Sequence, residues 1–178
     1  MHFSAYNESD KREIQALFTR TFSASEGPVE GELIGRLALD VMNETETKNI
    51  FGFVATENGH IVGCVFFTRL SFDSPIEAFL LAPVAVDTKY QGRGVGQKLI
   101  RFGIERLAEL GVKLVFTYGN PIYYAKVGFK HVPEEVAKPP FELSQPEGWL
   151  GQPLVGDGIK PLPGRSRCVA SFHDRRYW

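Results

Sequence analysis

The chain has 178 residues, which is long enough for one domain with a sizeable core. Hydrophobic residues make up 43%, charged residues 23%, and the formal net charge is -1, which excludes the strongly basic surface typical of nucleic-acid or anionic-lipid binding. No apolar run approaches the length of a membrane-spanning helix, and the opening stretch MHFSAYNESDKRE lacks the features of a secretory signal. We therefore expect a cytoplasmic protein with neither a nucleic-acid nor a membrane partner.

Two cysteines, Cys64 and Cys168, lie far apart in the chain and form no CxxC pair. In a protein without a secretory signal, this pattern favours reduced, buried thiols. The four histidines are scattered along the chain, whereas a zinc site needs several ligands at close spacing. We expect no metal site.

The first third of the chain predicts one strand and two helices. Residues 1–6 form a short strand, and Ser9 is the expected N-cap of an amphipathic helix over 10–22. Residues 23–28 are expected to form a loop, and 29–42 a second helix with acidic residues in its first turn.

The middle of the chain predicts three strands. The stretches 49–56 and 60–70 are rich in β-branched and aromatic residues, and the Glu-Asn-Gly segment 57–59 between them is typical of a hairpin turn. The apolar run 76–86 predicts a buried central strand.

A β-α-β unit follows from strand 76–86. The apolar spacing predicts a helix over 94–110 that ends at Gly111, and then a strand over 112–119 parallel to the central one. Asn120 and Pro121 are typical of the N-cap and first residue of a short helix, and 129–132 predicts another strand.

The remaining chain changes in character. Seven of the eleven prolines and five glycines fall within 133–164, so 133–165 is expected to be a long loop, with a final strand over 166–172. The element order predicts an α/β fold with a mixed sheet, and no linker divides the chain, so we expect one domain over 1–178.

The stretch VDTKYQGRGVGQKLI places Gly92, Gly94 and Gly96 between the central strand and the following helix. The first N–H groups of that helix lack partners inside it and lie at the positive end of its dipole, so a phosphate or pyrophosphate fits there, with Arg93 as an added contact. The Walker pattern is absent, and the third glycine of a dinucleotide fingerprint would fall on Gln97. A tight turn that binds nothing remains an alternative.

The motif Gln91-Gly92-Arg93-Gly94-Val95-Gly96 resembles the Q/R-x-x-G-x-G/A signature of the GNAT superfamily of acyl-CoA-dependent N-acyltransferases. The segment NPIYYAKVGF is similar to the second signature of that family, with Tyr124 followed by Gly128 and Phe129. The element order agrees as far as Phe129, and the segments LAPVAV, GNPIYY and FHDRRYW further resemble a bacterial subgroup of predicted N-acetyltransferases.

This resemblance implies a GNAT-like fold: a central, mostly antiparallel sheet with a parallel pair of strands splayed around acyl-CoA, and helices on both faces. It also implies an N-acetyltransferase that uses acetyl-CoA as cosubstrate and no metal. The acceptor is a primary amine of a small molecule or a protein, and a homodimer is an open alternative.

The resemblance also implies the site residues. The pantetheine arm would pair with the central strand, where Pro83 suits a bulge, and a backbone N–H near Val84 would stabilise the oxyanion. Tyr124 occupies the position of the acid that protonates the leaving thiolate, with Tyr123 as the adjacent alternative. Asn120 is either a helix cap or a pantetheine contact. The expected cofactor-binding residues are Val84, Ala85, Val86, Gln91, Gly92, Arg93, Gly94, Val95, Gly96, Gln97 and Asn120.

Other interpretations stay open. Tyr124 as a core residue would suit a non-catalytic acyl-CoA-binding sensor, and the glycine loop alone would suit a nucleotide or phosphate site. No base is assigned, because Glu77, Glu26, Glu30, Glu32 and a water chain are all candidates. We expect 133–164 to wall the acceptor cleft, held by the apolar anchors Phe141, Leu143, Trp149, Leu150 and Leu154.

Overall fold

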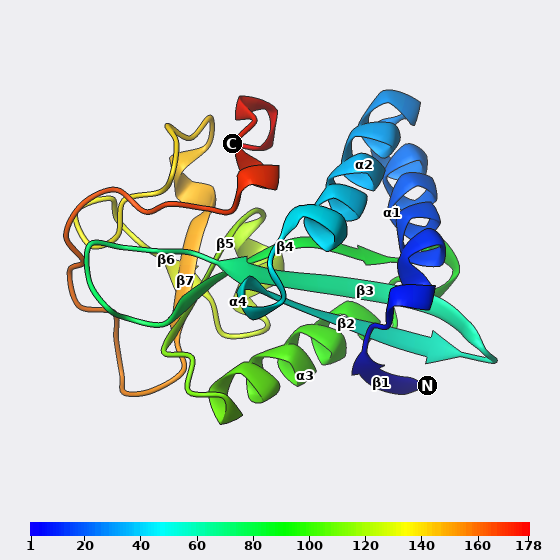
Figure 1. Ribbon diagram of the computed structural model, residues 1–178, viewed down its shortest axis with the longest axis horizontal. Helices are drawn as coiled ribbons and strands as arrows, with labels where there is room; N and C mark the ends of the chain where they lie inside the picture. The colour runs from blue at the N-terminus through cyan, green and yellow to red at the C-terminus, as the bar shows by residue number, and fades with distance from the viewer. The chain divides into compact units, whose positions relative to one another are not determined.

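The computed structural model describes residues 1–178 (Figure 1). None of its helices is long and apolar enough to cross a membrane. The helices and strands, in chain order, are β1 (His2–Ala5), α1 (Lys11–Glu26), α2 (Pro28–Glu44), β2 (Ile50–Glu57), β3 (His60–Arg69), β4 (Ala78–Val86), α3 (Val95–Glu109), β5 (Leu114–Tyr118), α4 (Pro121–Ala125), β6 (Lys130–His131) and β7 (Trp149–Pro153).

Two compact units make up the chain. The first unit contains Met1–Phe66 and Pro83–Gly103, and the second contains Phe67–Ala82 and Ile104–Trp178. Hydrogen-bonded strands follow the order β1-β2-β3-β4 in the first unit and β3-β4-β5-β7-β6 in the second, because β3 and β4 run through both. The expected mixed sheet is confirmed: β4 and β5 are parallel, whereas β1 with β2, β5 with β7 and β6 with β7 are antiparallel.

The helices of the first unit differ from the sequence prediction at their ends. Ser9 does not cap α1, because the N–H of Asn7 donates to the carboxylate of Asp10 at 2.7 Å and a 3-10 turn over Glu8–Asp10 precedes the helix. The expected loop over 23–28 is also wrong. Helix α1 continues to Glu26, and only Gly27, at φ 97°, separates it from α2, which begins at Pro28.

Close packing of α1 on α2 depends on two glycines. A Cβ on Gly31 would collide with Ser23, and a Cβ on Gly35 would collide with Thr19. The two helices lie side by side as an antiparallel pair (Figure 1). The close packing of α1 on α2, rather than the residues that connect them, therefore determines how the two helices are arranged.

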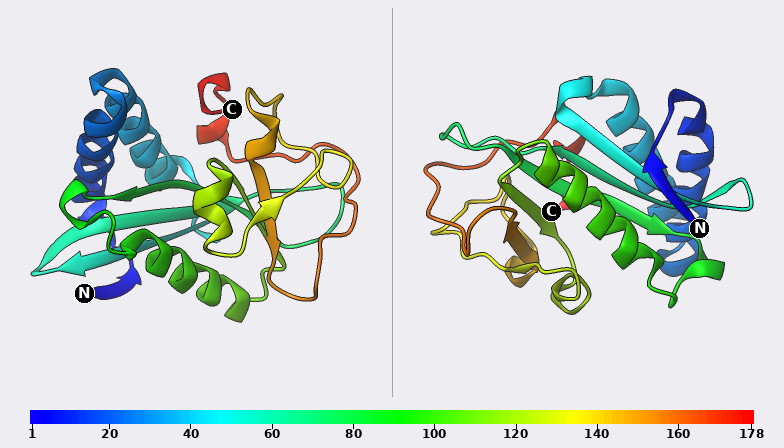
Figure 2. Two further views of the ribbon diagram at one scale, coloured as in Figure 1. Left: turned by 180° about the vertical axis from the view of Figure 1, so that it is seen from behind. Right: turned by 90° about the horizontal axis from the view of Figure 1, so that it is seen from below.

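The strands of the first unit carry helices on both faces. The ring of Phe18 on α1 stacks on Phe66 of β3 at 6.0 Å, and the ring of Phe102 on α3 meets Phe53 of β2 at 5.6 Å. Figure 2 shows α3 on the side of the strands opposite the α1–α2 pair. The expected hairpin turn is confirmed, since Asn58 and Gly59 have φ 53° and 78°, as a two-residue primed turn requires.

The second unit contains a strand that the sequence prediction missed. Within the expected loop 133–165, Trp149–Pro153 forms β7 and pairs antiparallel with β5 over five residues. The segment is short and carries Gly151 and Pro153, so its local β signal is weak. Gly151 is needed because a Cβ there would lie 2.8 Å from both Ile159 and Val132.

The expected final strand over 166–172 is wrong. Arg167 forms an isolated bridge with Ser71, and the chain then turns into a 3-10 helix at Ala170–Phe172. The ring of Phe172 packs against Tyr177 and Trp178, at 6.0 and 6.4 Å, and this aromatic packing accompanies a turn rather than an extended strand.

Candidate functional site

The end of β4 is held by side-chain and backbone bonds in the first unit. The N–H of Asp87 donates to the carbonyl of Val62 at 2.9 Å, and the side-chain amide of Gln91 donates to the carbonyl of Val86, also at 2.9 Å. Ala85 is buried, whereas Val84 and Val86 are partly exposed. Pro83 has no N–H, so it cannot donate a hydrogen bond to a neighbouring strand. A proline is therefore compatible with a position at which two strands of a sheet separate.

Asp87 fixes the entry to the glycine loop. Its carboxylate accepts from the N–H of Lys89 and from the guanidinium of Arg20, both at 3.0 Å. Partial burial raises the pKa of Asp87, but the bond from Lys89 and the charge of Arg20 outweigh that effect and leave the pKa below its ordinary value. The carboxylate therefore stays charged and keeps the turn over Thr88–Tyr90 in place.

The loop uses its glycines for backbone conformation. Gly92 and Gly94 have φ 72° and 74°, and the space where their Cβ atoms would lie is open. Residues with a side chain rarely adopt this conformation, so the glycines are required by φ and not by crowding. Gln91, Gly92 and Arg93 are exposed, and the Arg93 guanidinium lies 5.6 Å from the Tyr90 ring centroid.

Helix α3 begins directly after this loop. Its first helical bond runs from the N–H of Lys98 to the carbonyl of Gly94, at 3.0 Å. The N–H groups of Val95, Gly96 and Gln97 precede that bond and therefore lack a partner inside the helix. A helix terminus with such N–H groups and the positive end of the dipole suits an anion in general, and the anion site of this chain stays a prediction from the sequence.

Tyr124 lies on α4 in the second unit. Asn120 caps this helix, because its side-chain oxygen accepts from the N–H groups of Ile122 and Tyr123 at 2.9 and 3.3 Å. Tyr124 is 9% exposed, and its ring packs edge-on against Tyr123 and Phe129. Burial raises the pKa of Tyr124 to about 12, although a hydrogen bond with the Thr117 side chain opposes the rise.

Thr117 on β5 was missed by the sequence analysis. It is fully buried, and its hydroxyl donates to the carbonyl of Leu81 on β4 at 2.8 Å. The available signal was a polar residue inside the apolar run LVFTY, which in a buried strand requires a hydrogen-bond partner.

Comparison with known proteins decides the family. The model of the acetyltransferase (GNAT) domain matches residues 48–131. The Escherichia coli (strain K12) protein described as uncharacterized N-acetyltransferase YjhQ is 33% identical over 177 residues, covering 94% of this chain and 93% of that protein. The chain belongs to the GNAT acetyltransferase family. The resemblance seen in the sequence is thereby confirmed, as is the enzyme class it implies, an acetyl-CoA-dependent N-acetyltransferase.

Solved structures show the same fold. The GNAT family N-acetyltransferase YhbS from Escherichia coli, in complex with CoA, has a TM-score of 0.85 at 24% identity, covering 97% of this chain and 92% of that one. A GNAT family acetyltransferase from Brucella melitensis, in complex with acetyl-CoA, has a TM-score of 0.75 at 22% identity, covering 96% of this chain and 97% of that one. The expected GNAT fold is therefore confirmed.

The candidate bases of this GNAT chain fall into two groups. Glu77 is paired with Arg69 at 2.8 Å, so its carboxylate is already engaged. Glu26 and Glu32 are exposed, and Glu30 is half-buried at the start of α2. A proton acceptor must reach the amine in a bound complex, and no carboxylate is singled out by its contacts.

The thiols of the chain take no part in this site. Both cysteines are free and buried, as the sequence predicted. Burial raises the pKa of Cys64 and raises that of Cys168 to about 11, so both stay protonated at neutral pH. No group of three or more histidine, cysteine or acidic residues could hold a metal ion.

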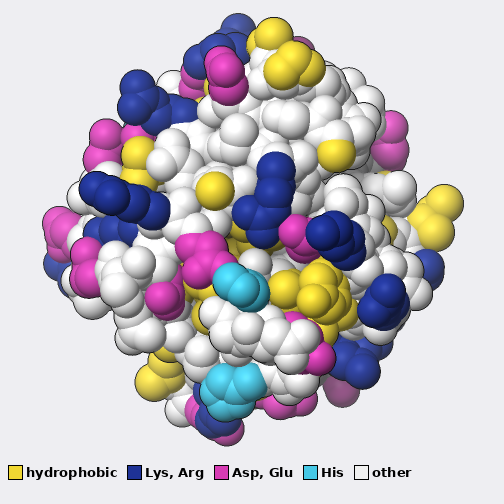
Figure 3. All heavy atoms as spheres, turned by 90° about the vertical axis from the view of Figure 1, so that its right-hand side faces the viewer, with side chains coloured by type: hydrophobic (Ala, Val, Ile, Leu, Met, Phe, Trp, Pro, Cys, Tyr) yellow, Lys and Arg dark blue, Asp and Glu magenta, His cyan; other side chains and the backbone are white.

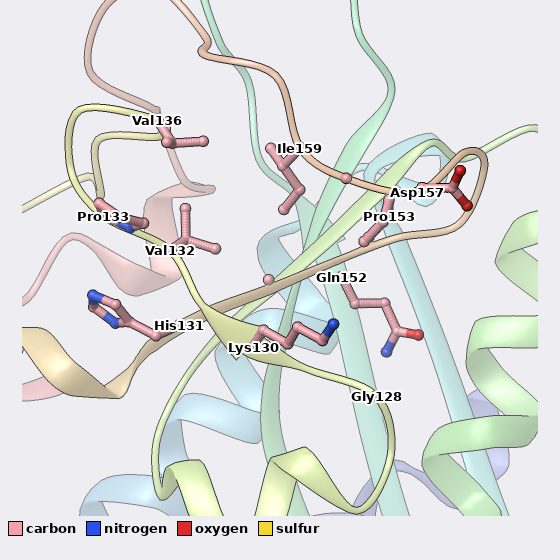
Figure 4. Close-up of a pocket in the computed structure, with 12 residues that line it drawn as sticks. Gly128, Lys130, His131, Val132, Pro133, Val136, Gln152, Pro153, Asp157 and Ile159 are labelled. Atoms are coloured by element: carbon pink, nitrogen blue, oxygen red, sulfur yellow. The ribbon is translucent and has the colours of Figure 1, made fainter.

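A pocket of about 410 Å³ lies beside β6 and β7 in the second unit (Figure 4). Val132, Val136 and Ile159 point toward one another across it, and Lys130 and Gln152 lie at its side. Two further pockets, of about 650 and 330 Å³, lie beside Phe141 and beside Asp87. None of the predicted catalytic or cofactor-binding residues lines any of these three pockets, whereas Phe141, an expected anchor of the acceptor-cleft wall, lines the second.

The surface charge of the first unit is mixed. Figure 3 shows basic and acidic side chains interspersed over the end at which β2 meets β3. Ion pairs such as Met1 with Glu57 and Arg20 with Asp87 join opposite charges there. The distribution agrees with the near-zero net charge and provides no broad field of one sign.

Proposed function

We propose that this GNAT chain transfers the acetyl group of acetyl-CoA to a primary amine of a small molecule or a protein by direct attack of the amine. The observation that carries the proposal is the glycine loop, whose positive-φ residues Gly92 and Gly94 lead into the free N–H groups at the start of α3. Such a terminus fits the pyrophosphate of CoA. The CoA and acetyl-CoA complexes of the two fold neighbours support this choice of anion.

The proposed binding residues extend from the strand to the helix. Val84, Ala85 and Val86 would pair with the pantetheine arm as an added strand, and Asn120 would contact the arm through its amide nitrogen, since its oxygen caps α4. The loop residues that would hold the pyrophosphate are Gln91, Gly92, Arg93, Gly94, Val95, Gly96 and Gln97.

The proposed chemistry needs two functions from the chain. Acetyl-CoA supplies an activated thioester carbonyl, and the backbone N–H near Val84 would stabilise the negative charge that develops on its oxygen. Tyr124 would donate its proton to the departing sulfur. With a pKa of about 12, its phenol is protonated at neutral pH and available as a donor.

The organisation of the chain supports one catalytic domain over 1–178, because a GNAT fold neighbour aligns with 97% of it. Within 133–165, the expected apolar anchors Leu143, Trp149 and Leu150 are buried, and Phe141 and Leu154 are half-buried. We propose that this segment walls the acceptor cleft. The cytoplasmic location and the homodimer stay predictions from the sequence.

The decisive test is a screen of primary amines and peptides with acetyl-CoA, measured as release of free thiol. We expect at least one acceptor to give turnover. CoA binding in calorimetry with no turnover for any acceptor would favour the sensor, and displacement of CoA by simple nucleotides at equal concentration would favour a nucleotide site.

A further inference from the structure

The pocket of about 410 Å³ beside β6 and β7, called here the β6–β7 pocket, is lined by none of the proposed catalytic or CoA-binding residues (Figure 4). Across the two strands, Lys130 pairs with Gly151 and His131 pairs with Leu150. Because alternate residues of a strand share one face of a sheet, Lys130 and Val132 lie on the same face as Gly151. That face forms one side of the pocket.

Aliphatic side chains form the walls of the β6–β7 pocket. A Cβ on Gly151 would lie 2.8 Å from both Val132 and Ile159, so these two side chains meet over the bare backbone of β7. The N–H of Leu162 donates to the carbonyl of Val136 at 2.7 Å, which holds together the two segments of chain that carry Val136 and Ile159. Val136 and Ile159 are only half-buried, so the walls leave apolar surface open to a ligand.

The pocket also carries a cation that no anion neutralises. Lys130 is exposed, and its ammonium forms no ion pair. Asp157 is the one acidic residue that lines the pocket, and Figure 4 shows its carboxylate turned away from Val132 and Ile159. Strand β6 lies at the edge of the sheet, where a lysine discourages pairing with another chain, but that role requires no apolar pocket beside it.

We propose that the β6–β7 pocket binds a small apolar carboxylate. Its carboxylate pairs with the Lys130 ammonium, and its hydrocarbon body packs against Val132, Val136 and Ile159. The motivation is the combination of a free cation with open aliphatic walls. A volume of about 410 Å³ lies within the range of small-molecule sites and accommodates a phenyl or branched alkyl group. The site uses neither Tyr124 nor the glycine loop, so it stands or falls independently of the proposed function.

The experiment measures binding of 3-phenylpropanoate to the whole chain by calorimetry, with 3-phenylpropanamide as the uncharged control. We expect a Kd of about 1 mM or tighter for the carboxylate, and binding at least about 10-fold weaker for the amide. Equal affinities for the two compounds would overturn the inference, as would no binding of the carboxylate at about 10 mM. Tighter binding of 2-phenylethylamine would show that the pocket takes a cation instead.

Charge variants test the role of Lys130. Lys130→Met removes the ammonium and keeps an apolar stem, so it should weaken binding of the carboxylate at least about 10-fold and leave binding of the amide unchanged. Lys160→Met is the matched control, because Lys160 is exposed and does not line the pocket, and it should leave both affinities unchanged. An equal loss in the two variants would show attraction by net charge alone and would contradict the proposal.

Asp157→Asn tests the sign of the charge that the pocket binds. Removal of a negative charge should leave binding of the carboxylate unchanged or tighten it by up to about 3-fold. Weaker binding in this variant would mean that Asp157 contacts a cationic group of the ligand, which the proposal excludes.

Two controls exclude other cationic places in the chain. Saturating CoA should leave the Kd of 3-phenylpropanoate unchanged, and displacement would place the compound in the CoA site. Arg165→Gln, in the pocket beside Phe141, should also leave it unchanged. Ile159→Asn should weaken binding of the carboxylate and the amide alike, by about 5-fold, because it removes apolar wall. Unchanged binding in Ile159→Asn, or a loss in Arg165→Gln, would move the compound out of the β6–β7 pocket and overturn the inference. If Ile159→Asn does not fold, Lys130→Met, changed at an exposed side chain, decides the outcome.

Discussion

The glycine loop and the Tyr124 region carry the two halves of the proposed chemistry by different physical means. The loop offers backbone N–H groups, and its conformation requires a positive φ at Gly92 and Gly94. The Tyr124 region offers one side-chain hydroxyl, and its position depends on the packing of its ring against Gly119 and Phe129. A backbone site tolerates changes of side chain that keep the conformation, whereas a side-chain site tolerates little change in its packing.

The difference also separates binding from chemistry. Substitutions in the loop should act on the affinity for CoA, and substitutions around Tyr124 should act on turnover.

The largest expected effect is on stability in the second unit. Trp149 is 1% exposed, stacks on Phe116 at 5.2 Å and donates its indole N–H to Ala137. Trp149→Ala should lower the free energy of unfolding by about 3–5 kcal/mol, measured in urea, because it leaves a cavity and an unpaired carbonyl. Val155→Ala, at a position 59% exposed, should change it by less than about 0.5 kcal/mol.

The CoA affinity of Trp149→Ala, measured at low temperature, tests whether the loop and the second unit act separately. Protein that remains folded should bind CoA in calorimetry with wild-type affinity, since the loop belongs to the first unit. A loss of CoA affinity larger than the loss of folded protein would show that the division is wrong.

Next in size is the effect of Tyr124→Phe on turnover. The phenyl ring keeps the packing and the proton donor is lost, so kcat should fall about 100-fold to 1000-fold while CoA affinity stays unchanged. Tyr123→Phe is the matched control, because Tyr123 is half-buried beside it on α4, and it should keep at least half of the activity. The reverse result would assign the acid role to Tyr123.

The pH dependence of kcat tests the same assignment. A proton donor is active below its pKa and is lost as the pH rises through it. Since burial raises the pKa of Tyr124 to about 12, its titration should leave kcat unchanged up to a pH of about 10. A fall in kcat as the pH rises through about 7, present in the wild type and absent in Tyr124→Phe, would contradict this pKa.

Among the test substitutions, the smallest expected effect is in the loop. Gly94→Val forces a β-branched residue into a conformation at φ 74°, at a cost of about 1–2 kcal/mol. If the loop relaxes to relieve that strain, its N–H groups turn away, and CoA should bind at least about 10-fold more weakly in calorimetry. Gly59→Val imposes the same strain at φ 78° in the β2–β3 turn and should cost similar stability with unchanged CoA affinity. Equal CoA affinity in both variants would remove the loop from the site.

The sequence predicted the elements with strong local signals. The β2–β3 turn, the Gly111 end of α3 and the Asn120 cap of α4 were all identified, because each depends on residues within four positions of one another. Errors fell where local signals were weak or competing. Ser9 does not cap α1, because the N–H of Asn7 bonds to the Asp10 carboxylate before the helix, and Gly27 alone, rather than a loop, separates α1 from α2.

For the candidate site, the sequence identified Tyr124 and the glycine loop but not Thr117. The loop is a contiguous motif, so its spacing alone indicates an anion site next to a helix terminus. Thr117 lies seven residues before Tyr124 and is joined by its hydroxyl to Leu81, 36 residues away in the chain. A single threonine in an apolar strand does not indicate which of its neighbours it will bond.

By itself, the sequence determined the mixed α/β class, the strand–glycine loop–helix motif and the resemblance to GNAT acetyltransferases. These follow from periodicity and from residues close together in the chain, whose physical preferences act locally. Only the tertiary structure decided that Trp149–Pro153 pairs as β7, that 166–172 turns instead of extending, and that the Thr117 hydroxyl bonds to the Leu81 carbonyl. Those outcomes depend on burial and on hydrogen bonds between distant segments, which stabilise a conformation that the local sequence specifies only weakly.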